Sequence, residues 1–319
     1  MNGALAFPNT PEGWRLPLDL YPWSLYIYGG ERALEAEGRC REGFDRFAPL
    51  PNLLTVGVAR RTPSRHAHFL LRCGNKQEED VTWSQLAEVI GQCLQRHGVT
   101  SPHIVFDITS LELDTILYLM PQLLELRPAT LQGLYLVPKE YVMKTQGLIL
   151  QPIQQPRGYV SFDPGLEGAR QAHHYIITGF DVGRAERFID AFDWGWERLH
   201  GVIGDPSYVD NGFDYAWNAN QSWLKRLEDD HPKNMHRIKA AGADGIRRFF
   251  QEEFVTHRWL DIVPLGPKPM LLGVLLFYLG LEERERARVR ILFDFPTPRP
   301  GSTEGAEKGY LFDCRALLT

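Results

Sequence analysis

The sequence is poor in cysteine. Its 319 residues include four, Cys40, Cys73, Cys93 and Cys314. No two of them have the short spacing of a zinc knuckle or a redox pair. We therefore predict four reduced thiols and a cytoplasmic protein, because thiols stay reduced in that compartment.

A long hydrophobic run is also missing. The longest apolar stretch, residues 270–281, is interrupted by Gly273 and Gly280 and is shorter than the roughly 20 residues that a membrane helix needs. We predict a buried core helix there. Residues 1–11 lack the basic start and apolar core of a signal peptide, so we expect no membrane partner.

Neither sign of charge dominates the chain. Lys and Arg number 35 against 40 Asp and Glu, which gives a net charge of −5 and a pI of about 6.1. This balance argues against a constitutive binder of nucleic acid or of anionic membranes, so direct DNA or RNA binding is not expected. The apolar fraction of 44% and the charged fraction of 24% are typical of globular domains.

Strong catalytic and cofactor motifs are absent as well. The sequence contains no GxGxxG, Walker, HExxH or nucleophile-elbow pattern. Two histidine pairs, His66 with His68 and His173 with His174, have no third ligand nearby in the sequence. We therefore predict no metal site, no cofactor and no catalytic residues.

What the chain does contain is one pattern that occurs twice. An apolar strand at 24–28 leads into Gly29 and a helix, and a second strand at 175–178 leads into Gly179 and a helix that opens at Gly183. The further matches are 53–58 with 199–203, 104–109 with 260–264, the apolar helices 111–126 with 269–281, and 134–138 with 291–296. Both final strands are expected to stop at a proline, Pro138 or Pro296, which cannot donate to a ladder.

The predicted strands are continuous apolar runs that alternate with helices, which is typical of parallel sheets covered on both faces. We predict an α/β fold of two tandem, pseudo-repeated Rossmann-like units with mainly parallel sheets. The alternative is that two unrelated α/β domains look alike at this level. The predicted boundaries are an irregular N-terminal segment 1–20, unit 1 at 21–150, a linker 151–168 and unit 2 at 169–319, with a polar loop at 296–308.

Ligands of open parallel sheets bind beyond the carboxyl ends of the strands, where helix N-termini present free N–H groups. The candidate ligand-binding residues at this edge are Gly30, Arg32, Thr109, Ser110, Gly179, Asp181, Arg184, Gly266 and Lys268. Each class of residue also has a structural interpretation. The glycines suit tight turns, the arginines can pair with neighbouring acids, and the two hydroxyls can cap a helix that starts near Leu111.

Lys268 is the most informative of these residues. It follows Gly266 and lies between two prolines at the predicted start of a helix. A cation is unfavourable beside the positive end of a helix dipole, so a lysine there is explained by an anionic ligand that both groups contact. The alternative is a proline-rich loop with a solvated lysine.

A group of tryptophans leaves two interpretations open. Trp194, Trp196, Trp217 and Trp223 fall close together, with Asn220 among them. Aromatic rings and amides can stack on and recognise a base, or the rings can pack an inserted helical segment.

The doubled unit, with its loops Gly179 to Arg184, Thr109-Ser110 and Gly266 to Lys268, resembles the CARF and SAVED domains of prokaryotic antiviral defence. The likeness covers most of residues 20–300 as architecture. In those families, equivalent loops of two pseudo-symmetric units hold a cyclic oligonucleotide. The chain departs from the family pattern because its loop reads Gly-Pro-Lys rather than Gly-Thr-Lys, and because unit 1 has no equivalent lysine.

From these features we expect a ligand-sensing or adaptor subunit of a bacterial antiviral defence system. It would bind an anionic, nucleotide-like ligand, such as a cyclic oligonucleotide, or a partner protein, where the two units meet. The resemblance implies that another protein subunit carries the effector activity. Two alternatives stay open: a purely structural subunit of a complex, and an enzyme that acts on a nucleotide or phosphodiester.

Overall fold

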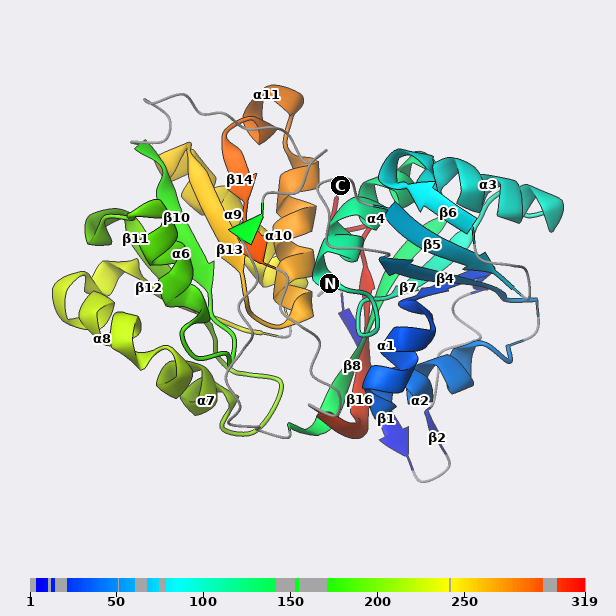
Figure 1. Cartoon of the computed structure of the whole chain (residues 1–319), viewed down its shortest axis with the longest axis horizontal. Helices are drawn as coiled ribbons and strands as arrows, with labels where there is room; N and C mark the ends of the chain where they lie inside the picture. The colour runs from blue at the N-terminus through cyan, green and yellow to red at the C-terminus, as the bar shows by residue number, and fades with distance from the viewer. Residues whose placement is uncertain are drawn as a thin grey trace. The chain divides into compact units, whose positions relative to one another are not determined.

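The computed structural model (Figure 1) describes residues 4–10, 13–14, 22–50, 52–60, 68–74, 79–141, 153–154, 171–240, 242–294 and 303–318. The chain divides into two compact units. The first contains residues 1–146 and 298–317, and the second contains residues 147–297. The second unit is thus inserted into the sequence of the first.

The first unit is built on a mixed sheet. Among the described residues, nine strands lie in the order β2-β1-β16-β8-β7-β3-β4-β5-β6. The central strands β8, β7, β3 and β4 are parallel, and the strands on either side of them are antiparallel to their neighbours. The bounds are β1 Ala4–Thr10, β2 Gly13–Trp14, β3 Leu25–Tyr28, β4 Leu54–Arg60, β5 His68–Cys73, β6 Glu79–Thr82, β7 His103–Asp107, β8 Thr130–Tyr141 and β16 Thr303–Asp313.

Helices cover both faces of this sheet. Alternation along β3 turns Tyr26 and Tyr28 toward a core that includes Phe47 of α2. Val56, on the other face, lies near Ile90 of α3. The helices are α1 Gly30–Ala36, α2 Gly38–Phe47, the 3-10 turn η2 Trp83–Gln85, α3 Leu86–Arg96 and α4 Leu113–Glu125.

The second unit has an all-parallel sheet. Its described strands lie in the order β12-β11-β10-β13-β14, and a separate antiparallel pair joins β9 to β15. The strands are β9 Ile153–Gln154, β10 His173–Ile177, β11 Leu199–Gly204, β12 Met235–Ile238, β13 Leu260–Pro264, β14 Val289–Ile291 and β15 Phe293–Asp294. The helical segments are α6 Arg184–Phe192, η3 Trp196–Arg198, α7 Gly212–Ala219, α8 Gln221–Asp230, η4 Pro232–Asn234, α9 Ala243–His257, α10 Lys268–Gly280 and α11 Glu283–Arg286.

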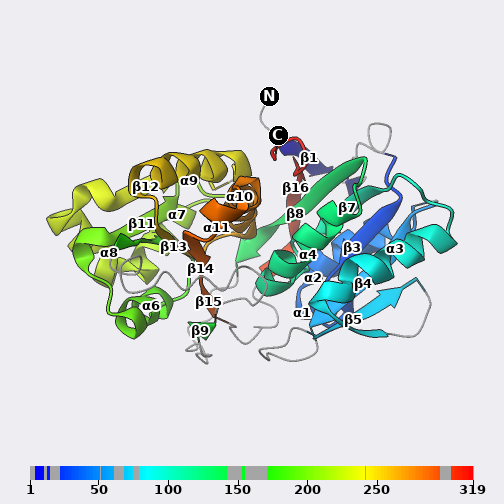
Figure 2. The same ribbon diagram turned by 90° about the horizontal axis from the view of Figure 1, so that it is seen from above.

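The two faces of this sheet have different helix layers. Helices α9 and α10 lie on one side and α6 on the other (Figure 2). Trp194 and Trp223 are buried in the core on the α6 side, and Trp196 and Trp217 pack against it while partly buried. The packing interpretation of the tryptophan group is therefore confirmed.

The prediction of two related Rossmann-like units is confirmed at the level of topology. The order β8-β7-β3-β4 in the first unit corresponds to β14-β13-β10-β11 in the second, with all four strands parallel in each case. The turns agree too. A Cβ atom on Gly29 would collide with the carbonyl oxygen of Ser110, and one on Gly179 would collide with that of Leu265. Each unit thus uses a glycine after its first parallel strand to let the loop after β7 or β13 approach.

The ends of the chain depart from the predicted boundaries. Residues 1–20 were expected to be irregular and 169–319 to form unit 2, but β1 and β16 both belong to the sheet of the first unit. The predicted loop 296–308 is a strand from Thr303 onward, where β16 pairs with β8. Pairing with segments far away in sequence produces these strands, so local composition did not indicate them. Apart from β9, the predicted linker 151–168 lies outside the described residues.

The expected proline stop is also wrong for the first unit. β8 continues through Pro138 to Tyr141. Pro138 lies opposite Ala306, and the register of β16 shifts between Ala306 and Lys308. This irregularity accommodates a strand residue that has no N–H to donate.

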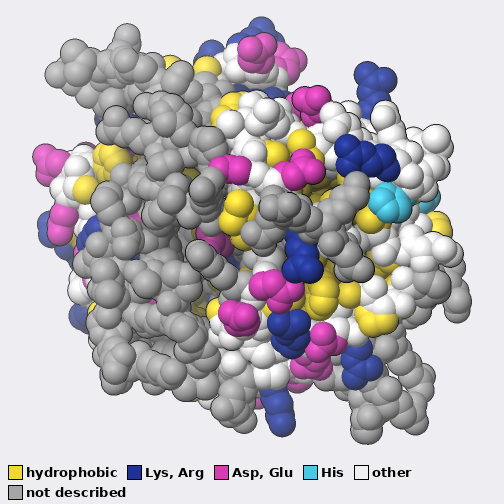
Figure 3. All heavy atoms as spheres, turned by 45° about the vertical axis from the view of Figure 1, so that its right-hand side comes forward, with side chains coloured by type: hydrophobic (Ala, Val, Ile, Leu, Met, Phe, Trp, Pro, Cys, Tyr) yellow, Lys and Arg dark blue, Asp and Glu magenta, His cyan; other side chains and the backbone are white. Residues whose placement is uncertain are grey.

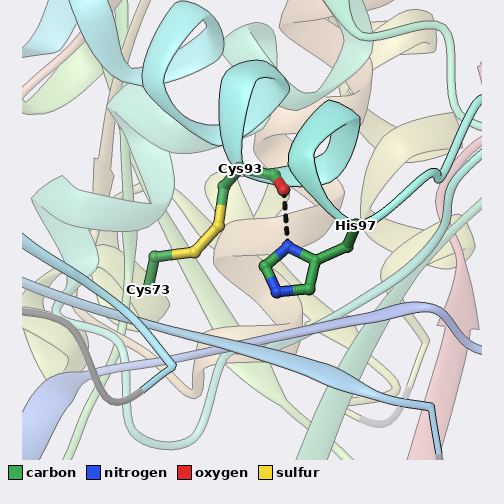
Figure 4. Close-up of a disulfide and its surroundings, with 3 residues drawn as sticks. All are labelled: Cys73, Cys93 and His97. Carbon is green, nitrogen blue, oxygen red and sulfur yellow. Dashed lines mark hydrogen bonds between the residues drawn. A yellow bond between two sulfur atoms is a disulfide. The ribbon is translucent and has the colours of Figure 1, made fainter.

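The cysteine prediction needs correction as well. Cys73 at the end of β5 and Cys93 in α3 form a disulfide (Figure 4), while Cys40 and Cys314 are free and buried. His97, one turn beyond Cys93, has its Nδ1 2.8 Å from the carbonyl oxygen of Cys93. The two bonded cysteines are 20 residues apart and meet only because α3 packs beside β5, so their spacing carried no motif.

The predicted core helix is confirmed as α10, in which every residue from Pro269 to Tyr278 is buried. No helix among the described residues is long and apolar enough to cross a membrane. On the described part of the face drawn in Figure 3, basic and acidic side chains lie interspersed. This mixture agrees with the near-neutral composition.

Candidate metal centre

The carboxyl edge of the second sheet brings two predicted residues together. Gly179 follows β10 and Gly266 follows β13, and a Cβ atom on Gly266 would come within 2.8 Å of Ile177. The side-chain amide of Asn220 donates to the carbonyl oxygen of Gly179 at 2.9 Å. Close backbone packing therefore accounts for both glycines.

Arg184 and Asp181 form part of an ion-pair cluster. The Arg184 guanidinium donates from Nε and Nη2 to Asp294 at 2.9 and 2.6 Å, and from Nη1 to Asp181 at 3.1 Å. Arg184 and Asp294 are both buried. Of the two roles considered for Arg184, the structure contains the pairing with neighbouring acids.

Lys268 is the first residue of α10, as predicted, and follows Pro267 at the N-cap. It is half-buried. Its neighbour Pro269 lies in the first turn of the helix, where a missing N–H costs nothing.

In the first unit, the predicted residues hold the loops together. The Thr109 hydroxyl accepts from the backbone N–H of Leu136 at 2.8 Å, and the Ser110 hydroxyl accepts from that of Gly29 at 2.9 Å. Neither caps a helix, because α4 begins only after Glu112, so the capping prediction is wrong. Gly30 opens α1 with a φ of 72°. Arg32 is in the same helix, but its side chain lies outside the described part of the chain.

A group of histidine side chains lies at the opposite, amino edge of the second sheet. His173 opens β10, His200 is the second residue of β11 and His236 is the second residue of β12. Parallel register places His200 beside Tyr175 and His236 beside Val202. Because alternate residues of a strand share a face, these histidines lie on the face covered by α9.

Helix α9 completes the cluster, which we call the histidine cluster: His173, His200, His236, His257 and Glu253. His257 is the last residue of α9, and Glu253 lies one turn earlier. His257 Nε2 is 3.4 Å from Glu253 Oε2. His174, next in sequence to His173, points to the other face, where its Nδ1 lies 2.9 Å from Asp261 Oδ2.

The imidazoles contact one another through their nitrogens. His173 Nδ1 lies 2.8 Å from His200 Nε2, and His200 Nδ1 lies 3.1 Å from His236 Nε2. Within the described residues, two groups of three side chains have ligand atoms close enough to share one metal ion. They are His173, His200 and His257, and His200, His236 and Glu253.

These spacings suit a tetrahedral ion. Metal–nitrogen bonds of about 2.0–2.1 Å at tetrahedral angles place neighbouring ligand atoms about 3.3 Å apart. The separations within the two groups, 2.8 Å between His173 and His200 and 3.1 Å between His200 and His236, lie slightly below this value. The rings of His173 and His257 stack at 3.6 Å with 25° between their planes, so one must turn for both to face the same ion. Rotation of an imidazole about its last torsion is soft.

The environment favours the neutral form of His173, His200 and His236, which is the form that binds metal. Burial, reinforced by the charges of His257, Arg198 and His174, lowers the pKa of His173 to about 4. Burial and then the neighbouring histidines lower the pKa of His200 to about 2. Burial also lowers the pKa of His236, against an opposing contribution from Glu253.

Tyr175 fixes the carboxylate of the cluster. Its hydroxyl donates to Glu253, and its ring stacks on His200 with 4.3 Å between centroids. Burial and this hydrogen bond raise the pKa of Tyr175 far above its ordinary value, so the tyrosine remains a donor. Such outer contacts orient metal ligands and tune their basicity.

This site was not predicted from the sequence. His173 was considered only with its neighbour His174, beside the His66–His68 pair. His66 lies outside the described residues, as does the side chain of His68. The available signal was that His200 is the second residue of the predicted strand 199–203 and that His173 lies two residues before the predicted strand 175–178. No strand was predicted at His236. Parallel strands align their starts at one edge, which would have placed His173 and His200 together.

Comparison with known proteins gives no further assignment. No family model matches the chain, and no curated protein matches its sequence.

Proposed function

We propose that the second unit binds a divalent transition-metal ion, with zinc as the preferred one, through His173, His200 and His257. The supporting observation is the convergence of three imidazoles from β10, β11 and the end of α9. Three nitrogen ligands leave a fourth tetrahedral position for water or for an anionic ligand, an arrangement common to catalytic zinc sites.

Neutral imidazole is a good ligand for zinc, copper, iron and nickel, whereas magnesium and calcium prefer oxygen. The predominance of nitrogen donors therefore favours the first group. The same contacts can also be satisfied without metal, by N–H···N hydrogen bonds between neutral rings. A direct measurement of metal content distinguishes the two cases.

The test uses the full chain, stripped with EDTA and then equilibrated with Zn²⁺. After gel filtration, wild type should retain zinc by elemental analysis, and His173→Ala combined with His257→Ala should lose the ion held there. Zinc should also raise the melting temperature of wild type, since a free concentration of about 100 times Kd adds about 2.7 kcal/mol to stability. His231→Ala, a histidine of the same unit outside both metal-binding groups, is the control.

A protein that retains no zinc and melts at the same temperature with and without it would refute the proposal. Equal zinc retention in the double variant and in wild type would show that the ion binds elsewhere.

We retain the nucleotide-like ligand as a second candidate. It is supported by Lys268 at the start of α10 beside Gly266, where backbone packs closely against β10. An anion there would contact both the helix N–H groups and the ammonium. Calorimetry with inorganic phosphate and with cyclic oligonucleotides tests it. Binding by wild type that weakens about tenfold or more in Lys268→Ala would support the candidate, and no binding of any probe would remove it.

A further inference from the structure

His200 belongs to both groups of metal-binding side chains. Its Nε2 faces His173 and its Nδ1 faces His236, at 2.8 and 3.1 Å. The two ring nitrogens of an imidazole point away from each other, so no single ion can bind both. The side chains on either side of His200 therefore define two different metal positions, with this one ring between them.

The second position has its own oriented donors. His236 comes from β12 and Glu253 from α9. Tyr175 holds the Glu253 carboxylate by a hydrogen bond, and the His236 ring packs against Phe249 with 4.9 Å between centroids. Two histidines and one carboxylate form a zinc ligand set that leaves one position open.

We propose that this position binds a second divalent ion, so that His200 bridges two ions through its two ring nitrogens. The proposal rests on the metal-binding function proposed for His173, His200 and His257. A neutral imidazole has one lone pair and one N–H. Binding of the second ion displaces that ring proton to solvent, and His200 then coordinates both ions as imidazolate. No oxidant or reductant is involved.

The charges of the cluster suit this arrangement. The carboxylate of Glu253 and the imidazolate of His200 each offset part of the charge of the two cations. His257 lies 3.4 Å from the same carboxylate, which places a ligand of the first ion beside one of the second.

The spacing of the two ions limits their chemistry. Two metal–nitrogen bonds of about 2.0–2.1 Å with a ring between them place the ions roughly 6 Å apart. Two-metal hydrolases hold their ions about 3.5–4 Å apart, so that both contact one reacting group. The bridged pair would thus act at separate open positions rather than as one clamp.

The test counts ions and then detects the bridge. Full-length protein is stripped with EDTA, equilibrated with Zn²⁺ and analysed for zinc per chain after gel filtration. We expect two ions in wild type, one in His236→Ala, which keeps the His173, His200 and His257 set, and two in the control His231→Ala. Circular dichroism and thermal melting of each variant establish that it is folded.

The bridge itself is tested with Cu²⁺ and electron paramagnetic resonance. Two copper ions joined by an imidazolate couple magnetically, so the integrated signal of wild type should account for less than half of the bound copper. In His236→Ala the remaining ion should give its full signal. Glu253→Gln keeps the shape of the side chain and provides a second variant directed at the same position.

The outcomes separate the two proposals. If no zinc binds, both fail. If wild type binds one ion and His236→Ala also binds one, the metal function stands and the bridged pair is refuted. If wild type binds two ions but its copper signal is fully intact, the ions are not bridged by His200.

Discussion

Arg184 holds Asp294 by hydrogen bonds to both carboxylate oxygens, with Nε 2.9 Å from Oδ1 and 3.1 Å from Oδ2. The contact joins the first turn of α6 to β15, and both side chains are buried. Removing one partner of a buried ion pair leaves an uncompensated charge, which costs about 3–5 kcal/mol. We expect Arg184→Ala to lower the free energy of unfolding by about that amount in urea denaturation, reduced somewhat by Arg187, which lies 3.6 Å from the same carboxylate.

Arg226 provides the matched control. It pairs with Asp230 at 3.8 Å, but both side chains are more than half exposed, so Arg226→Ala should cost less than about 1 kcal/mol. Equal effects at the two arginines would mean that Arg184 is not a structural residue and that its role as a ligand contact should be reconsidered.

Gly179→Ala should destabilise the second unit. The added methyl group would collide with the carbonyl oxygen of Leu265, and overpacking of this kind costs about 1–3 kcal/mol. Gly29→Ala should have a similar effect through the carbonyl oxygen of Ser110. Gly38 opens α2 and has nothing within 4 Å of its Cβ position, so Gly38→Ala should be neutral or stabilising. If Gly38→Ala lowers the melting temperature as much as the other two substitutions do, the close backbone approach at Gly29 and Gly179 is not what makes those positions sensitive.

The disulfide determines which cysteines can react with a thiol reagent. Denatured, unreduced protein should react with a thiol reagent at Cys40 and Cys314 only, and all four cysteines should react after reduction. Cys73 and Cys93 are separated by 20 residues, and a cross-link over a loop of this length stabilises a protein by about 3 kcal/mol. Cys73→Ser should show that loss in urea under non-reducing conditions. Four reactive thiols in the unreduced protein would contradict the bond.

The histidine cluster predicts loss of stability in mild acid. A histidine in the unfolded chain titrates near its ordinary pKa of about 6.5, whereas the pKa of His173 in the folded chain is about 4. Between these values the unfolded chain binds more protons than the folded chain, so the free energy of unfolding falls as the pH falls. His200, with a pKa of about 2, acts in the same direction. Above a pH of about 6.5 these histidines are neutral in both the folded and the unfolded chain, so the free energy of unfolding is not reduced there.

Denaturation in EDTA at a pH of about 7.5, 6 and 5 tests this dependence, since these values span the ordinary histidine pKa. Replacing a buried, neutral histidine by a residue that does not titrate should make the curve flatter, so His200→Gln should lose less stability than wild type between the highest and the lowest pH. His231→Gln should follow the wild-type curve. A wild-type stability that is constant over this range would show that the histidines are not held neutral.

Much of the fold could be predicted because its main signals are local. Each parallel strand is a continuous apolar run, and each copy carries a glycine after its first strand, at Gly29 and Gly179. These features identified four matching strands that follow one another along the chain in the same succession in both units. The core helix α10 could be predicted equally well, since its apolar residues follow one another almost without interruption.

The remaining strands depend on distant partners. β16 forms beside β1 and β8, and nothing in the polar sequence around Thr303 indicates which strands it joins. The disulfide has the same character, because Cys73 and Cys93 meet through the packing of a helix on a strand. Long-range pairing of this kind leaves little trace in a single sequence.

The histidine cluster was not predicted, because the candidate residues were sought at the other, carboxyl edge of the second sheet. Carboxyl-edge residues were chosen from the general behaviour of open parallel sheets, and Arg184 pairs there with the buried Asp294 and the partly exposed Asp181. The histidine cluster lies at the amino edge, where His173, His200 and His236 are far apart in sequence. Only the alignment of β10, β11 and β12 brings them together, so the cluster required the strand order as well as the residues.

Because β16 comes late in the chain, the sheet of the first unit is completed only late in synthesis. β8 is complete at Tyr141, but the strand that covers its edge begins only at Thr303. A chain emerging from the ribosome therefore carries the whole second unit before β8 gains its neighbour. Until then β8 has an unpaired edge, and the strand carries apolar residues such as Leu134 and Leu136 that are buried in the folded protein. An unpaired edge of this kind can pair with strands of other chains. The inserted unit can close on its own strands first, while the sheet of the first unit stays incomplete until residues 303–313 have been made. We therefore expect the first unit to be the more exposed of the two to aggregation and to chaperones.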